Sequence, residues 1–192
     1  MIKNDFSELE SIATPEIQTE TRDKDVIFIG SGKYMDADDE LLKITKWIKE
    51  NSPHNSEIKP EKIKYLYTTT TKKDGGRFVL GSLVLRSEIE KMVNDSCDYI
   101  LFVNYKTWKE LDIKHKIIQL DKILCGIFID DMENKTKKMS VDSKEYINNL
   151  RHYGPEDVLN SSEIIDMATQ RIVQQEKEER KAMKEKIKKD EE

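Results

Sequence analysis

Residues Ile113 to Val141 read IKHKIIQLDKILCGIFIDDMENKTKKMSV, and the first half of this stretch decides the fold. Its apolar residues recur at steps of three and four, the spacing of one face of an α-helix. They are Ile113, Ile117, Leu120, Leu124 and Ile127. The pattern predicts an amphipathic helix over Ile113–Ile127 that packs beneath a sheet. A second face at the same steps carries His115, Gln119, Lys122 and Gly126.

Strands and helices surround this segment, which predicts an α+β fold with a small mixed sheet. Helical spacing over residues 41–51 follows acidic residues typical of a helix start, and Pro53 ends that helix. Apolar runs predict strands centred on Ile63–Tyr67, Arg77–Leu85 and Tyr99–Val103. We expect the first two to pair as a hairpin and the third to be central. Gly81 predicts a bulge or a close backbone approach.

The second face of the predicted helix lies where a zinc-dependent peptidase carries its H-E-x-x-H motif. That motif sets two zinc-binding histidines one turn apart, with a general-base glutamate between them. The segment here reads Lys122-Ile123-Leu124-Cys125-Gly126. An ammonium repels Zn²⁺, an aliphatic side chain takes no proton from water, and glycine has no side-chain ligand. The sequence therefore predicts such a helix without its chemistry.

With its Gly75-Gly76 turn, its Trp108-x-x-Leu111 segment and this helix, the chain resembles the putative phage metallopeptidase family over about Asp25 to Pro155. That family is SprT-like and zincin-like and is encoded by phages and prophages. The resemblance implies a helix reading H-E-L-C-H and a later H-D-x-x-E-F that supplies a third zinc ligand. Leu124, Cys125, Asp142 and Glu145 match, with Tyr146 in place of Phe, whereas Lys122, Ile123, Gly126 and Val141 depart. The resemblance thus implies a zincin-like helix beneath the sheet. It implies zinc in active relatives only, so no cofactor is expected here.

Three segments divide the chain. Residues 1–24 are polar and acidic and predict a flexible arm. Residues 25–155 form the expected metallopeptidase-like domain. Residues 156–192 predict a long C-terminal helix, which we expect to begin near Ser161 and to end in a tail where positive and negative charges balance.

Composition limits the compartment and the partners. The net charge of −5 argues against a chain that binds nucleic acid as a whole. No apolar stretch is long enough for a membrane span, and the first residues lack the apolar region of a signal peptide. Cys97 and Cys125 are the two cysteines and predict reduced thiols. These features favour a protein of the host cytoplasm with no membrane partner.

Three functions remain open on the sequence. The favoured hypothesis is a catalytically inactive protein that binds an unknown protein partner from host or phage. Its candidate cleft or partner face consists of His115, Gln119, Lys122, Asp142 and Glu145. The second is an active zinc peptidase with displaced ligands. The third is a nucleic-acid-associated module that uses the basic loops, namely Lys72, Lys73, Arg77, Lys135, Lys137 and Lys138.

Overall fold

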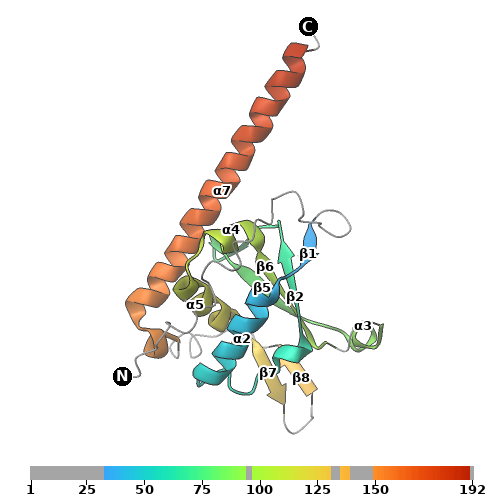
Figure 1. The fold of residues 1–192 in the computed structure, drawn as a ribbon, viewed down its shortest axis with the longest axis vertical. Helices are drawn as coiled ribbons and strands as arrows, with labels where there is room; N and C mark the ends of the chain where they lie inside the picture. The colour runs from blue at the N-terminus through green and yellow to red at the C-terminus, as the bar shows by residue number, and fades with distance from the viewer. Residues whose placement is uncertain (1–32, 94–96, 131–134, 139–148, 191–192) are drawn as a thin grey trace.

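The computed structural model describes residues 33–93, 97–130, 135–138 and 149–190 (Figure 1). In chain order the elements are β1 (Tyr34–Asp36), α2 (Asp39–Asn51), η2 (Pro60–Lys62), β2 (Ile63–Thr68), β3 (Lys72–Asp74), β4 (Arg77–Val79), β5 (Gly81–Leu85), α3 (Glu88–Val93), β6 (Tyr99–Asn104), α4 (Tyr105–Glu110), α5 (Ile113–Leu124), β7 (Ile127–Asp130), β8 (Lys135–Lys138) and α7 (Pro155–Asp190). The α+β class is confirmed. The short apolar run at residues 25–29, which also predicts a strand, lies outside the described residues.

The main sheet has the strand order β1-β2-β6-β5. β2 runs parallel to β6, with Tyr65 opposite Leu101, and β1 and β5 are antiparallel to their neighbours. The central position of β6 is confirmed. The predicted hairpin between β2 and the segment Arg77–Leu85 is wrong, because that segment divides in two. β4 pairs with β3 in a separate ribbon, and β5 pairs with β6.

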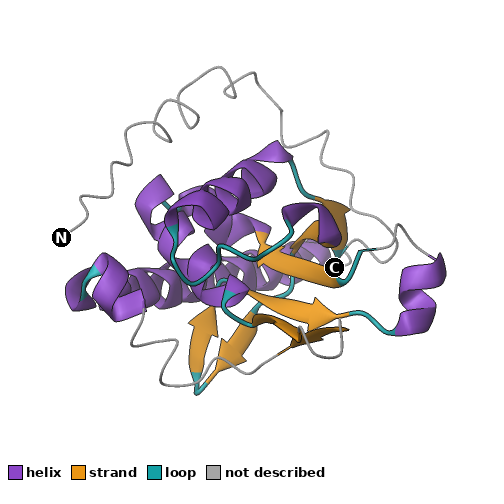
Figure 2. Ribbon diagram, turned by 90° about the horizontal axis from the view of Figure 1, so that it is seen from below, coloured by secondary structure: helices purple, strands orange, loops and turns teal. Residues whose placement is uncertain are grey.

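The core lies between the sheet and helices α2 and α5. Side chains alternate along a strand, so Tyr99, Leu101 and Val103 of β6 all point to the same face and are buried there. They share one apolar cluster with residues from both helices and from the α4 segment: Leu41, Ile44 and Ile48, then Ile117, Ile118, Leu120 and Leu124, with Trp108. Figures 1 and 2 show these helices packed against the sheet.

Glu40 joins the helices at one end of this core. Its two carboxylate oxygens accept from the indole nitrogen of Trp108 at 2.7 Å and from the ammonium of Lys116 at 2.8 Å. The start of α2 is fixed separately by Asp38, whose side chain accepts from the backbone nitrogen of Glu40. Residues far apart in the sequence therefore set the position of α5 against α2.

Helix α5 ends three residues earlier than the spacing of its apolar residues predicts. The backbone nitrogen of Cys125 donates to Asp121, that of Gly126 donates to Ile123, and the chain turns. Ile127 is then the first residue of β7, which pairs antiparallel with β8. The prediction that Ile127 belongs to the helix is therefore wrong.

Helix α7 begins at Pro155, six residues before the predicted start. Its first half packs on the domain, where Val158, Ile165 and Ile172 are buried. Figure 1 shows its C-terminal part, coloured red, running away from the rest of the molecule. Among the described residues, no helix combines the length and the apolar composition that a membrane crossing requires.

Candidate functional site

Helix α5 carries three residues of the candidate face, namely His115, Gln119 and Lys122. Asp112 caps the helix and accepts hydrogen bonds from the backbone nitrogen of His115 at 2.9 Å and from its ring Nδ1 at 2.5 Å. This contact holds the imidazole at the first turn of the helix. His115 is thus engaged with the helix start and does not line the cavity that the next two residues share.

Gln119 joins α5 to α7. Its side-chain amide donates to the hydroxyls of Ser161 at 3.1 Å and Ser162 at 3.2 Å. Gln119 and Ser161 are both buried, so these bonds form in surroundings where a polar group needs a partner. One function of Gln119 is therefore to hold the two helices in register.

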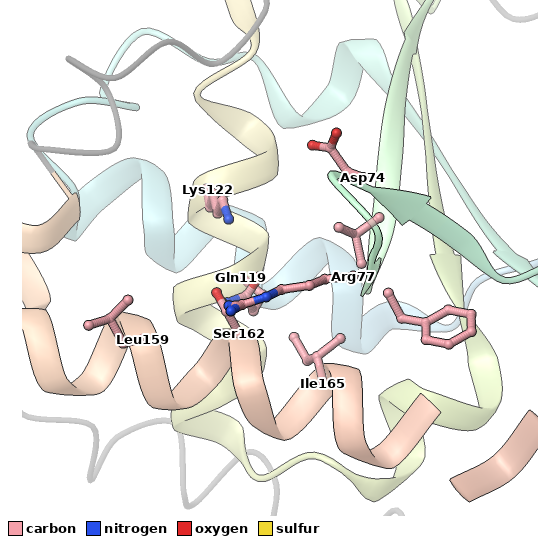
Figure 3. Close-up of a pocket in the computed structure, with 9 residues that line it drawn as sticks. Asp74, Arg77, Gln119, Lys122, Leu159, Ser162 and Ile165 are labelled. Carbon is pink, nitrogen blue, oxygen red and sulfur yellow. The ribbon is translucent and has the colours of Figure 1, made fainter. Parts of the chain in front are cut away.

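Lys122 faces a cavity of about 220 Å³ between α5, α7 and the β3–β4 ribbon (Figure 3). The residues that line it are Asp74, Arg77, Phe78, Val79, Gln119, Lys122, Leu159, Ser162 and Ile165. Burial lowers the pKa of the Lys122 ammonium below its ordinary value, and the nearby carboxylate of Asp74 opposes this shift. The structure therefore brings Lys122 and Gln119 together at one cavity and adds Arg77 and Asp74 from a distant part of the sequence.

The residues at the motif positions do not fit a zinc ion. Lys122 contributes an ammonium, Ile123 packs partly buried against the apolar core, and Gly126 is buried just beyond the helix end. Zinc in proteins takes imidazole, thiolate or carboxylate ligands, and none of these three positions supplies one. Within the described ranges, no three His, Cys, Asp or Glu side chains cluster closely enough to hold a metal. Val141, Asp142 and Glu145 lie outside the described residues.

A buried polar cluster lies around Asp121, whose side chain is fully buried. Asn55, in the loop after α2, donates to Asp121 Oδ1 at 2.5 Å. The hydroxyls of Ser52 and Tyr153 also interact with this carboxyl group. Neither they nor Asp121 Oδ2 reach hydrogen-bond geometry with any described residue. The cluster thus joins the loop after α2, helix α5 and the helical residues 149–153.

Cys125, four residues after Asp121, belongs to the same cluster. Its sulfur lies 3.6 Å from Asn55 Nδ2 and 3.9 Å from Asn149 Oδ1, and the thiol is buried and not in a disulfide. The sequence analysis missed this cluster. The spacing of Asp121 and Cys125, one helical turn apart between apolar neighbours, was the available signal.

Burial sets the charge state of Asp121. It raises the pKa of this carboxyl above its ordinary 3.8, although the hydrogen bond from Asn55 and the nearby hydroxyls of Tyr153 and Ser52 oppose the shift. As the pH rises above 3.8, the unfolded chain releases this proton before the folded chain does. The Asp121 contribution to stability is therefore full below that pH and is lost as the pH rises through the folded-state pKa.

We expect Asp121→Asn to be more stable than the natural chain near neutral pH, by on the order of 1 kcal/mol, because the variant has no buried charge to form. The gain should vanish below the unfolded-state pKa. Urea unfolding of both proteins across this pH range measures the difference. Asp36→Asn, at a largely exposed carboxylate, is the control and should change little. An equal gain at every pH would contradict the assignment.

Comparison with known proteins gives one match. The family described as putative phage metallopeptidase matches residues 32–177, from just before β1 into α7. A search of curated proteins and a search of solved structures each found no match. The family match covers more than half of the chain and confirms the resemblance inferred from the helix and its surrounding strands. By this match, the chain belongs to the putative phage metallopeptidase family.

Proposed function

We propose that this chain uses a metallopeptidase scaffold for binding and not for hydrolysis. In this proposal, a segment of a protein partner, from host or phage, occupies the cavity between α5, α7 and the β3–β4 ribbon. The encounter would take place in the host cytoplasm. The observation that carries the proposal is the Lys122 side chain, which lines this cavity from the first motif position.

The groups missing at these motif positions argue against the zinc-water mechanism. A zinc peptidase needs ligands that hold the ion, a water in the open position and a carboxylate that takes a proton from this water. Lys122 repels the ion, and Ile123 accepts no proton. Gly126, just beyond the end of α5, leaves only backbone at the remaining motif position. The absence of all three groups supports loss of the reaction over a change of metal.

The walls of the cavity suit a peptide segment. Phe78, Leu159 and Ile165 provide apolar surface, and Leu159 is 49% exposed at the opening. The guanidinium of Arg77 and the ammonium of Lys122 belong to residues that line the same cavity. Peptide-binding sites commonly join apolar surface with a few fixed polar groups that set orientation.

Two measurements on the purified full-length chain test this function. We expect zinc well below one equivalent by elemental analysis, and a melting temperature that does not change when EDTA is added, because in this proposal the fold forms without a structural metal. We also expect no hydrolysis of casein with zinc present. Stoichiometric zinc together with casein hydrolysis that EDTA abolishes would refute the proposal.

The binding half of the proposal needs its own comparison. We expect immobilised chain to retain a specific protein from host or phage-infected lysate, and Leu159→Asp to lose it. Met167→Asp is the matched control, because it adds the same charge to the same helix at a 67% exposed position that does not line the cavity. Equal capture by all three proteins would place the partner elsewhere.

A further inference from the structure

The cavity contains more positive than negative charge. Of the described residues that line it, Arg77 and Lys122 are cationic and Asp74 is anionic. The whole chain has a net charge of −5, so this local excess runs against the general charge. Figure 3 shows the Arg77 side chain reaching across the cavity toward Gln119 and Ser162, with the Lys122 ammonium on the α5 side.

Arg77 is held on a fixed ribbon. Gly75 and Gly76 have φ values of 54° and 86°, the left-handed values that a tight two-residue turn between β3 and β4 requires. The backbone nitrogen of Phe78 donates to Asp166 Oδ1 of α7 at 2.8 Å, which anchors the ribbon to the helix. The backbone from which Arg77 extends is therefore fixed relative to α7.

Apart from the three charged residues, the side chains that line the cavity are apolar or form hydrogen bonds within the protein. Ile165 is almost fully buried, and Phe78 and Val79 are half-buried. Ser162 accepts from Gln119 and donates to the carbonyl of Val158 at 3.2 Å. Arg77 and Asp74 are exposed and Lys122 is half-buried, so Lys122 is the lining charge whose interactions water screens least.

We propose that this cavity binds one carboxylate group of the partner polypeptide, held between the Lys122 ammonium and the Arg77 guanidinium. This inference rests on the proposed peptide-binding function and names the chemistry that the site recognises. A guanidinium matches the two oxygens of a carboxylate, and charge-assisted hydrogen bonds are stronger than neutral ones. Among the described residues that line the cavity, two cations and one anion leave a single net positive charge, which fits a monoanion better than a doubly charged phosphate.

The burial of Lys122 supports this reading. Because burial lowers the pKa of its ammonium, the free protein carries a cation that its surroundings hydrate poorly. A bound carboxylate would stabilise this cation. The carboxylate can come from an Asp or Glu side chain or from the C-terminus of the partner, and both present the same group.

Nuclear magnetic resonance titration of the full chain tests the inference with small probes. N-acetyl-glutamate α-amide carries only a side-chain carboxylate, N-acetyl-alanine carries only a terminal one, and N-acetyl-glutamine amide carries none. We expect one or both carboxylates to shift the Arg77 side-chain signal saturably, with Kd on the order of millimolar. The neutral amide and inorganic phosphate should bind at least about tenfold more weakly.

Charge variants give effects of opposite sign. Lys122→Gln and Arg77→Gln should each weaken carboxylate binding about tenfold, whereas Asp74→Asn should strengthen it about threefold. Lys46→Gln, at an exposed cation on α2, is the matched control and should leave Kd unchanged. Amide exchange spectra confirm that each variant is folded.

The outcomes separate this inference from the function on which it rests. Equal binding of the neutral amide, tighter binding of phosphate, or no binding of either carboxylate overturns the carboxylate assignment. In each case the zinc and lysate measurements still decide the proposed function. Weaker binding with Asp74→Asn would also overturn the inference, because it would show that the carboxylate is not the group being recognised.

Discussion

Replacing Ile165 by aspartate is expected to lower the free energy of unfolding by about 3–5 kcal/mol, enough to unfold much of the protein at moderate urea concentration. Ile165 lies on α7, is 1% exposed and belongs to the apolar core. A carboxylate there loses the core contacts of Ile165 and most of its hydration, and Arg77 and Lys122, which line the same cavity, offset only part of this cost. Urea unfolding followed by circular dichroism gives the free energy directly.

Two controls show whether the effect comes from burial. Met167→Asp adds the same charge two residues away at a 67% exposed side chain and should cost less than about 1 kcal/mol. Deletion of residues 177–192 should leave the unfolding curve unchanged, because the described side chains from Lys177 onward are exposed. An unfolded truncation together with a silent Ile165→Asp would show that the distal part of α7, and not its buried stripe, supports the domain.

Replacing Gly81 by alanine is expected to cost about 3 kcal/mol or more through a single methyl group. A Cβ atom built at Gly81 lies 2.1 Å from the carbonyl oxygen of Phe102 on the neighbouring strand β6. That oxygen is backbone, and both strands are paired along their length, so neither side moves without breaking the ladder. The close backbone approach predicted from the sequence is confirmed at this residue.

The measurement for Gly81→Ala is thermal and urea unfolding, with Ser82→Ala as the control. Ser82 is the next residue on the same strand and already has a Cβ atom, so its replacement should change stability by less than about 1 kcal/mol. A Gly81→Ala protein as stable as the natural chain would show that β5 can shift away from β6.

The sequence correctly predicted those features whose pattern lies within a few neighbouring residues. The spacing Ser87-x-x-Glu90 predicts a capping box, and Ser87 Oγ donates to Glu90 Oε2 at 2.8 Å. Helix α2 starts where the acidic residues place it. The C-terminal end of α5 was harder to predict, because Ile127 continues the apolar spacing of the helix although it is the first residue of β7. At Gly154-Pro155 the sequence predicts the end of a short helix, whereas Pro155 is the first residue of α7, a position that proline also favours. The same residue type supports both interpretations.

Pairings across long sequence distances could not be predicted in this way. The partner of β5 depends on which strand edge is free, and no local pattern contains that information. The same holds for the cavity. Gln119 and Lys122 were identified by their spacing on one helix, but Arg77 and Asp74 reach them only because the β3–β4 ribbon docks on α7. The burial of Asp121 could not be predicted, because a single carboxyl between apolar neighbours looks solvent-facing until Asn55 is placed beside it.

The projecting end of α7 has a consequence for how the molecule moves through water. Beyond Val173 the helix extends for roughly 25 Å at 1.5 Å per residue, with exposed side chains along most of that length. An elongated particle has a higher frictional coefficient than a sphere of equal mass. A monomer of this chain should therefore elute early in gel filtration, at an apparent mass well above its 22.5 kDa. Sedimentation equilibrium, which does not depend on shape, is the measurement that counts its subunits.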